Sequence, residues 1–136
     1  MVIDLNTEIV LRLVLAAVFG AIVGYEREKR KIPAGLRTHM LVCVGSALIT
    51  LTSLFAFEGA DPARVAAGIV TGIGFLGAGA IIRVKNSVHG VTTAADIWVI
   101  AGVGLALGAG FYLGAFTTLI LLVIIMYMRK FEKKRR

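Results

Sequence analysis

The amino-acid sequence predicts an all-α, polytopic membrane protein, a bundle of five transmembrane helices with the N-terminus outside and the C-terminus in the cytoplasm. Three observations support this fold class. The 136 residues are 58% hydrophobic and have a mean hydropathy of +0.89, whereas soluble proteins are roughly 45–50% apolar. Only 17% of the residues are charged, and these charges gather between long uncharged runs. The composition therefore excludes a soluble globular domain and a disordered chain.

The first three spans follow from the positions of the charges. Residues 40–57 and 65–82 carry no charge, and each run is long enough to cross a hydrocarbon core of roughly 30 Å as a helix. Residues 13–25 form the apolar body of an earlier span. Arg12 precedes that body, and we expect it to extend towards the interface and to pair with Glu8 one helical turn away.

The last uncharged run, residues 97–128, is too long for one ordinary crossing. A straight helix of that length would measure about 48 Å at 1.5 Å per residue. The glycine-rich stretch 108–114 offers a turn between two short spans. Residues 97–128 are therefore predicted to form the fourth and fifth spans.

The distribution of lysine and arginine sets the expected orientation. With five spans, the basic residues of segments 25–39, 83–96 and 129–136 all lie on one side, which the positive-inside rule makes cytoplasmic. Four spans would put the tail on the opposite face. We therefore divide the chain into a transmembrane domain, residues 1–128, and a basic cytoplasmic tail, residues 129–136, for which anionic lipid is the expected partner. No basic residue precedes the first apolar stretch, so the whole chain is expected to be mature.

Small residues recur at spacings that predict close helix packing, which substitutes for hydrophobic burial inside a bilayer. The candidate packing glycines are Gly20, Gly24, Gly68, Gly72, Gly74, Gly77, Gly79, Gly104 and Gly108. These stripes also indicate a homo-oligomer. Residues 72–77 match G-x-G-x-x-G, but they lie inside an uncharged span and not between a strand and a soluble helix, so no nucleotide site is expected.

Polar side chains crowd the expected cytoplasmic ends of the spans. The candidate polar cluster consists of Glu26, Arg27, Arg37, Thr38, Arg83, Thr92, Thr93 and Asp96. Glu26 and Asp96 are candidate ligands for a hydrated cation such as Mg²⁺, which needs only one or two carboxylates. The arginines instead favour an anionic partner such as lipid headgroups. The alternative of equal weight is that these residues are anchors, ion pairs and caps, with Thr93 and Asp96 in a capping box.

The remaining polar residues indicate structural roles. On the external side, Asp61 is expected to cap the third span ahead of Pro62 and to pair with Arg64. His39 and His89 are expected to be interface residues, and the single cysteine cannot form an intrachain disulfide. The chain has no nucleophile–base pair, phosphate loop or nucleic-acid-binding fold, so we expect neither an enzyme, a resident cofactor nor a nucleic-acid partner.

Five motifs together resemble the transmembrane domain of the MgtC/SapB family. They are residues 20–28 (GAIVGYERE), 34–39 (AGLRTH), 61–66 (DPARVA), 72–79 (GIGFLGAG) and 90–95 (GVTTAA), the last followed by Trp98. The resemblance runs from about residue 10 to residue 128. It implies a multi-pass plasma-membrane protein of a bacterium or archaeon, in a family linked to growth in low magnesium and to survival inside macrophages.

Departures from the virulence-associated members shape the functional expectation. This chain resembles a short member without the C-terminal soluble domain, and it has Thr92 and Val99 where those members have Asn and Cys. The leading hypothesis is a non-enzymatic regulator of another membrane complex, tied to magnesium or envelope homeostasis and acting by helix–helix contact. The alternative is a small homo-oligomeric cation transporter or channel that uses Glu26 and Asp96. A third hypothesis is interaction with lipid through the basic tail.

Overall fold

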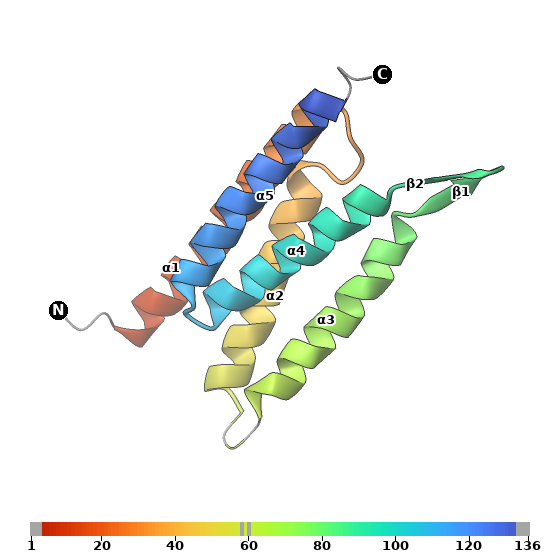
Figure 1. Ribbon diagram of the computed structural model, residues 1–136. Coiled ribbons are helices and arrows are strands. Elements are labelled where there is room, and N and C mark those ends of the chain that lie inside the picture. The colour runs from red at the N-terminus through yellow and green to blue at the C-terminus, as the bar shows by residue number, and fades with distance from the viewer. Residues whose placement is uncertain (1–3, 58, 60, 133–136) are drawn as a thin grey trace.

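The computed structural model describes residues 4–57, 59 and 61–132, which form five helices and one two-stranded hairpin (Figure 1). The elements are α1 (Leu5–Lys29), α2 (Leu36–Phe55), α3 (Pro62–Gly79), β1 (Ile82–Val84), β2 (Ser87–His89), α4 (Val91–Gly108) and α5 (Tyr112–Glu132). The first four helices are long and apolar enough to span a membrane, and α5 contains a shorter apolar stretch, Tyr112–Met128. The prediction of five helices is confirmed.

The predicted break in the last uncharged run is confirmed, and its cause is local. Helix α4 ends at Gly108 and α5 starts at Tyr112, with Gly110 between them at φ +76°. This left-handed conformation is accessible to glycine without steric cost, so the chain reverses there. Helix α5 continues through Glu132, so residues 129–132 of the expected tail are helical, and residues 133–136 lie outside the described residues.

The all-α expectation is wrong for the segment between α3 and α4. Helix α3 ends at Gly79, before the end of the uncharged run, and β1 and β2 pair as an exposed antiparallel hairpin with Arg83 opposite Val88. Isoleucine and valine at alternate positions favour extended backbone, and Lys85 adopts φ +51° in the turn. Hydropathy alone does not separate these residues from the helix before them.

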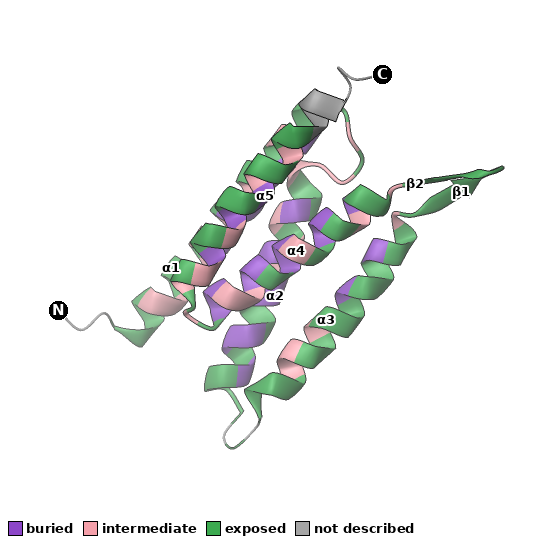
Figure 2. Ribbon diagram, viewed as in Figure 1, coloured by how far each residue is buried: buried purple, intermediate pink, exposed green. Residues whose placement is uncertain are grey.

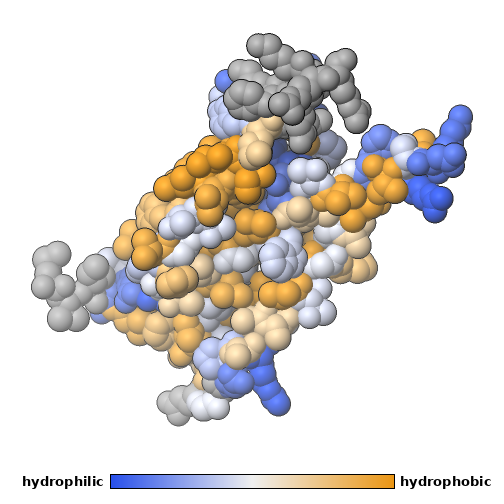
Figure 3. Space-filling view, viewed as in Figure 1, coloured by the Kyte–Doolittle hydropathy of each residue, from blue (hydrophilic) through white to orange (hydrophobic). Residues whose placement is uncertain are grey.

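The two ends of the bundle differ in charge. The α1–α2 connection, the hairpin and the end of α5 lie at one end, and residues 56–61 and the α4–α5 turn lie at the other (Figure 1). The first of these is called the basic end, because it carries Arg27, Lys29, Arg30, Lys31, Arg37, Arg83 and Lys85. Apolar surface covers much of the body between the ends, and hydrophilic side chains gather at them (Figure 3).

The main core lies between α1, α2, α4 and α5, and close backbone approach determines how α1 and α4 pack against α2. A Cβ on Gly20 or Gly24 of α1 would lie 2.6 Å from atoms of the α2 backbone. On α4, Gly108 would meet the Ala47 carbonyl of α2 at 2.6 Å, and Gly104 would meet the Cys43 carbonyl even closer. These four glycines therefore set the α1–α2 and α2–α4 separations, as expected for small residues in lipid.

Helix α3 is packed differently. Only Ile73 and Gly77 of this helix are buried, and most of its surface is exposed (Figure 2). A Cβ on Gly77 would make ordinary contact with Ala94 of α4 at 3.6 Å. The other predicted packing glycines of this helix meet nothing within 4 Å; they are Gly68, Gly72, Gly74 and Gly79. They do not pack against another helix among the described residues, because α3 touches α4 along one narrow stripe.

Candidate functional site

A buried arginine near the end of α1 joins three parts of the fold at the basic end. Arg27, only 2% exposed, forms an ion pair with Asp96 of α4 and donates a 2.6 Å hydrogen bond to Thr93 Oγ1. The same guanidinium donates to the carbonyl oxygens of Pro33 and Ala34 at 2.7 and 3.0 Å. It thereby connects the α1–α2 connection to the first turns of α4.

The local sequence explains why the partners on α4 face inward. Thr93 and Asp96 lie three residues apart, on one face of the helix, and both are 5% exposed. The expected capping box is wrong, because the N-cap of α4 is Gly90 (φ +89°) and the helix begins at Val91, two residues before Thr93. Both side chains are therefore inside the helix and free to bind Arg27, which compensates the buried carboxylate.

The second candidate carboxylate belongs to a different contact. Glu26 Oε1 lies 2.5 Å from Nη2 of Arg30, one turn further along α1. Arg30 also donates to the Met126 carbonyl of α5 at 3.0 Å, and its guanidinium carbon lies 4.9 Å from the centre of the Tyr127 ring. This pair ties α1 to α5 at the basic end.

Glu26 and Asp96 are thus held by two different arginines and do not share a site. Within residues 4–57, 59 and 61–132, no three His, Cys, Asp or Glu side chains are grouped so that they could hold a metal ion. The charges of both candidate ligands are already compensated by an arginine, and Asp96 is buried besides.

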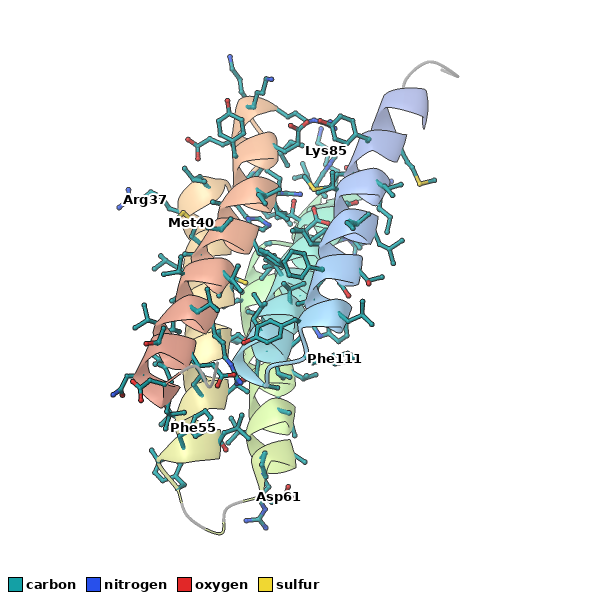
Figure 4. The ribbon with its side chains drawn as sticks, turned by 90° about the vertical axis from the view of Figure 1, so that its left-hand side faces the viewer. Arg37, Met40, Phe55, Asp61, Lys85 and Phe111 are labelled. Atoms are coloured by element: carbon teal, nitrogen blue, oxygen red, sulfur yellow. The ribbon has the colours of Figure 1, made fainter. Side chains whose placement is uncertain are left out.

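The rest of the predicted polar cluster lies on the surface. Arg37, Thr38, Arg83 and Thr92 are exposed. Arg83 donates a long hydrogen bond of 3.4 Å to the Lys85 carbonyl within the hairpin. Arg37 extends outward from α2, one helical turn before Leu41 (Figure 4). The structure therefore brings together only Arg27, Thr93 and Asp96 of the eight predicted residues.

Two residues near this cluster have roles that the sequence did not reveal. His39 was expected at the interface but is fully buried, because the glycines of α1 bring that helix onto α2. Its Nδ1 lies 3.1 Å from the Gly35 carbonyl, and Nε2 finds no partner within the described part of the chain. Glu28 accepts a 3.0 Å hydrogen bond from the Leu36 amide and so caps α2 from eight residues upstream. No local capping pattern has that spacing.

A second buried arginine closes the opposite end of the bundle. Arg12 pairs with Glu8, as predicted, and is only 8% exposed. It donates to the Gly108 carbonyl at 2.7 Å and to the Tyr112 hydroxyl at 3.1 Å. The last carbonyls of a helix lack partners within that helix, so the end of α4 offers Arg12 an acceptor. An isolated charge inside an apolar helix is the signal that points to such a role.

Asp61 lies at this opposite end, away from Lys85 (Figure 4), and Arg64 follows it in the first turn of α3. Asp61 Oδ1 accepts from the Ala63 amide at 2.9 Å, with Pro62 at the first helical position, so its predicted capping role is observed. The Arg64 side chain is exposed, and the structure contains no ion pair between these two described residues.

Comparison with known proteins identifies related chains. The model of the MgtC family matches residues 13–134. The chain is 42% identical over 130 residues to "Putative magnesium transporter YhiD" of Escherichia coli K12, covering 89% of this chain and 60% of YhiD. It is 41% identical over 129 residues to protein SapB of Bacillus subtilis 168, covering 88% and 56% of the two chains.

A third relative is protein MgtC of Salmonella typhimurium LT2, 43% identical over 114 residues, with 84% of this chain and 49% of MgtC covered. This chain thus spans between about half and three-fifths of the length of these relatives. No solved structure matches it. The family match covers most of the residues and includes α1 to α5, so this multi-pass membrane protein belongs to the MgtC family.

Proposed function

We propose that the chain is a non-enzymatic plasma-membrane protein that serves magnesium or envelope homeostasis by helix–helix contact with another membrane complex. One observation carries the proposal: α3 contacts α4 and, less extensively, α2, and leaves most of its surface exposed. Phe75 on α3 is 83% exposed, and a side chain on the neighbouring Gly74 would meet nothing within 4 Å. Exposed small residues beside an aromatic ring offer a close-approach surface for a partner helix.

The proposed orientation places the basic end in the cytoplasm of a bacterium or archaeon, with the N-terminus outside. The support is the gathering of the α1–α2 connection, the hairpin and the end of α5 at one end of the bundle. Lysine and arginine in short loops favour the cytoplasmic side. The basic tail, residues 129–136, would then face the anionic inner leaflet.

A photo-crosslinking amino acid at Phe75 tests the contact in native membranes. We expect one discrete adduct with a membrane protein at Phe75, and none at the fully buried His39 position. Gly74→Leu should abolish the adduct because the added side chain blocks close approach. The matched control is Gly102→Leu on α4, where an added Cβ also meets open space. An adduct unaffected by Gly74→Leu would contradict the proposed surface.

Magnesium transport by a homo-oligomer is the second candidate function, favoured by the printed name of the YhiD relative. In this candidate Mg²⁺ is the substrate, and Glu26 and Asp96 contact it. Proteoliposomes with a trapped magnesium indicator test it. Protein-dependent flux that disappears in Glu26→Gln would support transport. Silent vesicles with folded, oriented protein would favour the contact mechanism, as the arginine pairing of both carboxylates already does.

A further inference from the structure

An apolar groove runs between α2 and α3, with α4 beneath it. It has a volume of about 560 Å³ and is lined by Leu41, Gly45 and Ile49 of α2 and by Gly68, Gly72 and Leu76 of α3, among others. A Cβ built on any of these three glycines meets nothing within 4 Å, so the missing side chains create the space. Ser46 is the hydroxyl residue in the lining, and its hydroxyl donates to the Ala101 carbonyl at 2.7 Å. The groove therefore presents no unpaired side-chain polar group and suits an apolar occupant.

The groove is about as long as one leaflet of a bilayer is thick, and its lining lies in the middle part of both α2 and α3. Its lining on α2, Leu41 to Ile49, rises about 12 Å, and its lining on α3, Val65 to Leu76, rises about 16 Å at 1.5 Å per residue. Half of a hydrocarbon core of roughly 30 Å is about 15 Å. A transmembrane partner helix would need the whole thickness and a width of about 10 Å. The dimensions therefore favour a single acyl chain over a helix.

The positively charged side chain of Arg37 lies beyond the end of the groove where a lipid headgroup would lie. Arg37 lies four residues before Leu41, so the two side chains are neighbours on one face of α2. It lies about 6 Å further along the helix axis, at the basic end, where it is exposed. Among the residues that the structure describes, no carboxylate pairs with it. A phosphate at this depth would complement its charge.

We infer that this groove binds one acyl chain of an anionic phospholipid whose phosphate pairs with Arg37. The acyl chain fills the space left by the three glycines and covers the α2-facing side of α3. Only Ile73 and Gly77 of that helix are otherwise buried. The bound lipid thus completes the packing of α3 without using its outward face around Gly74. The inference does not depend on a protein partner, and its test needs none.

Native mass spectrometry of the purified full chain tests this inference, with phosphatidylglycerol and phosphatidylcholine of identical acyl chains as probes. We expect one retained lipid per chain and about a fivefold preference for phosphatidylglycerol, the contribution of one arginine near an anionic surface. Arg37→Gln should remove the preference and keep the lipid. Arg64→Gln, at the opposite end, should change neither.

Filling the groove provides the independent arm of the test. Gly72→Leu and Gly45→Leu, made separately on its two walls, should each eliminate the retained lipid, whereas Gly74→Leu outside the lining should not. Circular dichroism identifies any variant that fails to fold. If one of the two filling variants does not fold, lipid retention is judged from the variant on the other wall. Equal binding of both lipids, or retention of lipid in the filled variants, overturns the inference. Loss of a dimer mass in Gly72→Leu with lipid binding unchanged would overturn it in favour of a second copy of the chain.

Discussion

Removing one partner of the buried Arg27–Asp96 pair is predicted to destabilise the bundle strongly. In Arg27→Met, the Asp96 carboxylate stays 5% exposed beside Thr93 and loses its counter-charge. In Asp96→Asn, an amide oxygen still accepts from the guanidinium, which keeps its bonds to Thr93 and to the carbonyls of Pro33 and Ala34. The two variants therefore leave different groups unpaired, and their costs should differ.

The magnitudes follow from what each variant leaves unpaired. Isolating a buried charge costs about 3–5 kcal/mol, which we expect for Arg27→Met. Asp96→Asn also leaves a buried charge, that of Arg27, without its counter-charge, but the guanidinium keeps its other hydrogen bonds, so we expect the lower end of that range, about 3 kcal/mol. The double variant Arg27→Met/Asp96→Leu removes both charges. It should cost less than the sum of Arg27→Met and Asp96→Leu by about 1–3 kcal/mol, because neither charge is left alone.

Equilibrium unfolding in mixed micelles, followed by circular dichroism, measures these free energies. Arg64→Met is the control, since that arginine is exposed and should change the free energy of unfolding by no more than about 0.5 kcal/mol. Additivity of the Arg27→Met and Asp96→Leu effects within about 0.5 kcal/mol would refute the coupling. A cost for Arg27→Met no larger than that of Arg64→Met would refute the buried-charge argument altogether.

Three further predictions concern packing, capping and orientation. Gly104→Ala should cost about 1–3 kcal/mol in the same unfolding assay, because its Cβ meets the Cys43 carbonyl. Gly102→Ala, whose Cβ meets nothing within 4 Å, should be neutral or stabilising by up to about 1 kcal/mol. Equal effects of the two substitutions would contradict the close approach. Glu28→Ala should cost about 0.5–2 kcal/mol through loss of the α2 cap, and unchanged stability would contradict that role. In a Cys43→Ser background, a membrane-impermeant maleimide should label Ala109→Cys in intact cells and Lys85→Cys only after permeabilisation, and the reverse pattern would invert the proposed orientation.

The helices were predictable from the sequence because hydrocarbon leaves the backbone few choices. A spanning segment must satisfy its own N–H and C=O groups, so a long uncharged run reads directly as a helix. The glycine turn at Gly110 was predictable for the same reason, because the run was too long for one crossing. The hairpin after α3 was not, since Ile82 and Val84 are as apolar as the helix before them. Outside the bilayer core, hydropathy no longer separates strand from helix.

The candidate site was only partly predictable. Polar residues at the expected cytoplasmic ends include Arg27, Thr93 and Asp96, which do meet, but the same pattern also marked Arg37 and Thr92, which stay exposed. A charge near a helix end looks the same in sequence whether it faces lipid headgroups or another helix. Glu28 and Arg12 were missed for a related reason, because their acceptors and donors belong to other elements.

By itself, the sequence determined the class of protein, the five helices and the gathering of basic residues in alternate loops, because composition and run length govern partition into a bilayer. Only the tertiary structure decided which arginines are buried and which glycines set helix separations. Arg27 and Asp96 are 69 residues apart in the chain, and their contact exists because α1 and α4 both pack against α2. Such contacts depend on the mutual rotation of separate helices, which side-chain packing decides and local sequence does not encode.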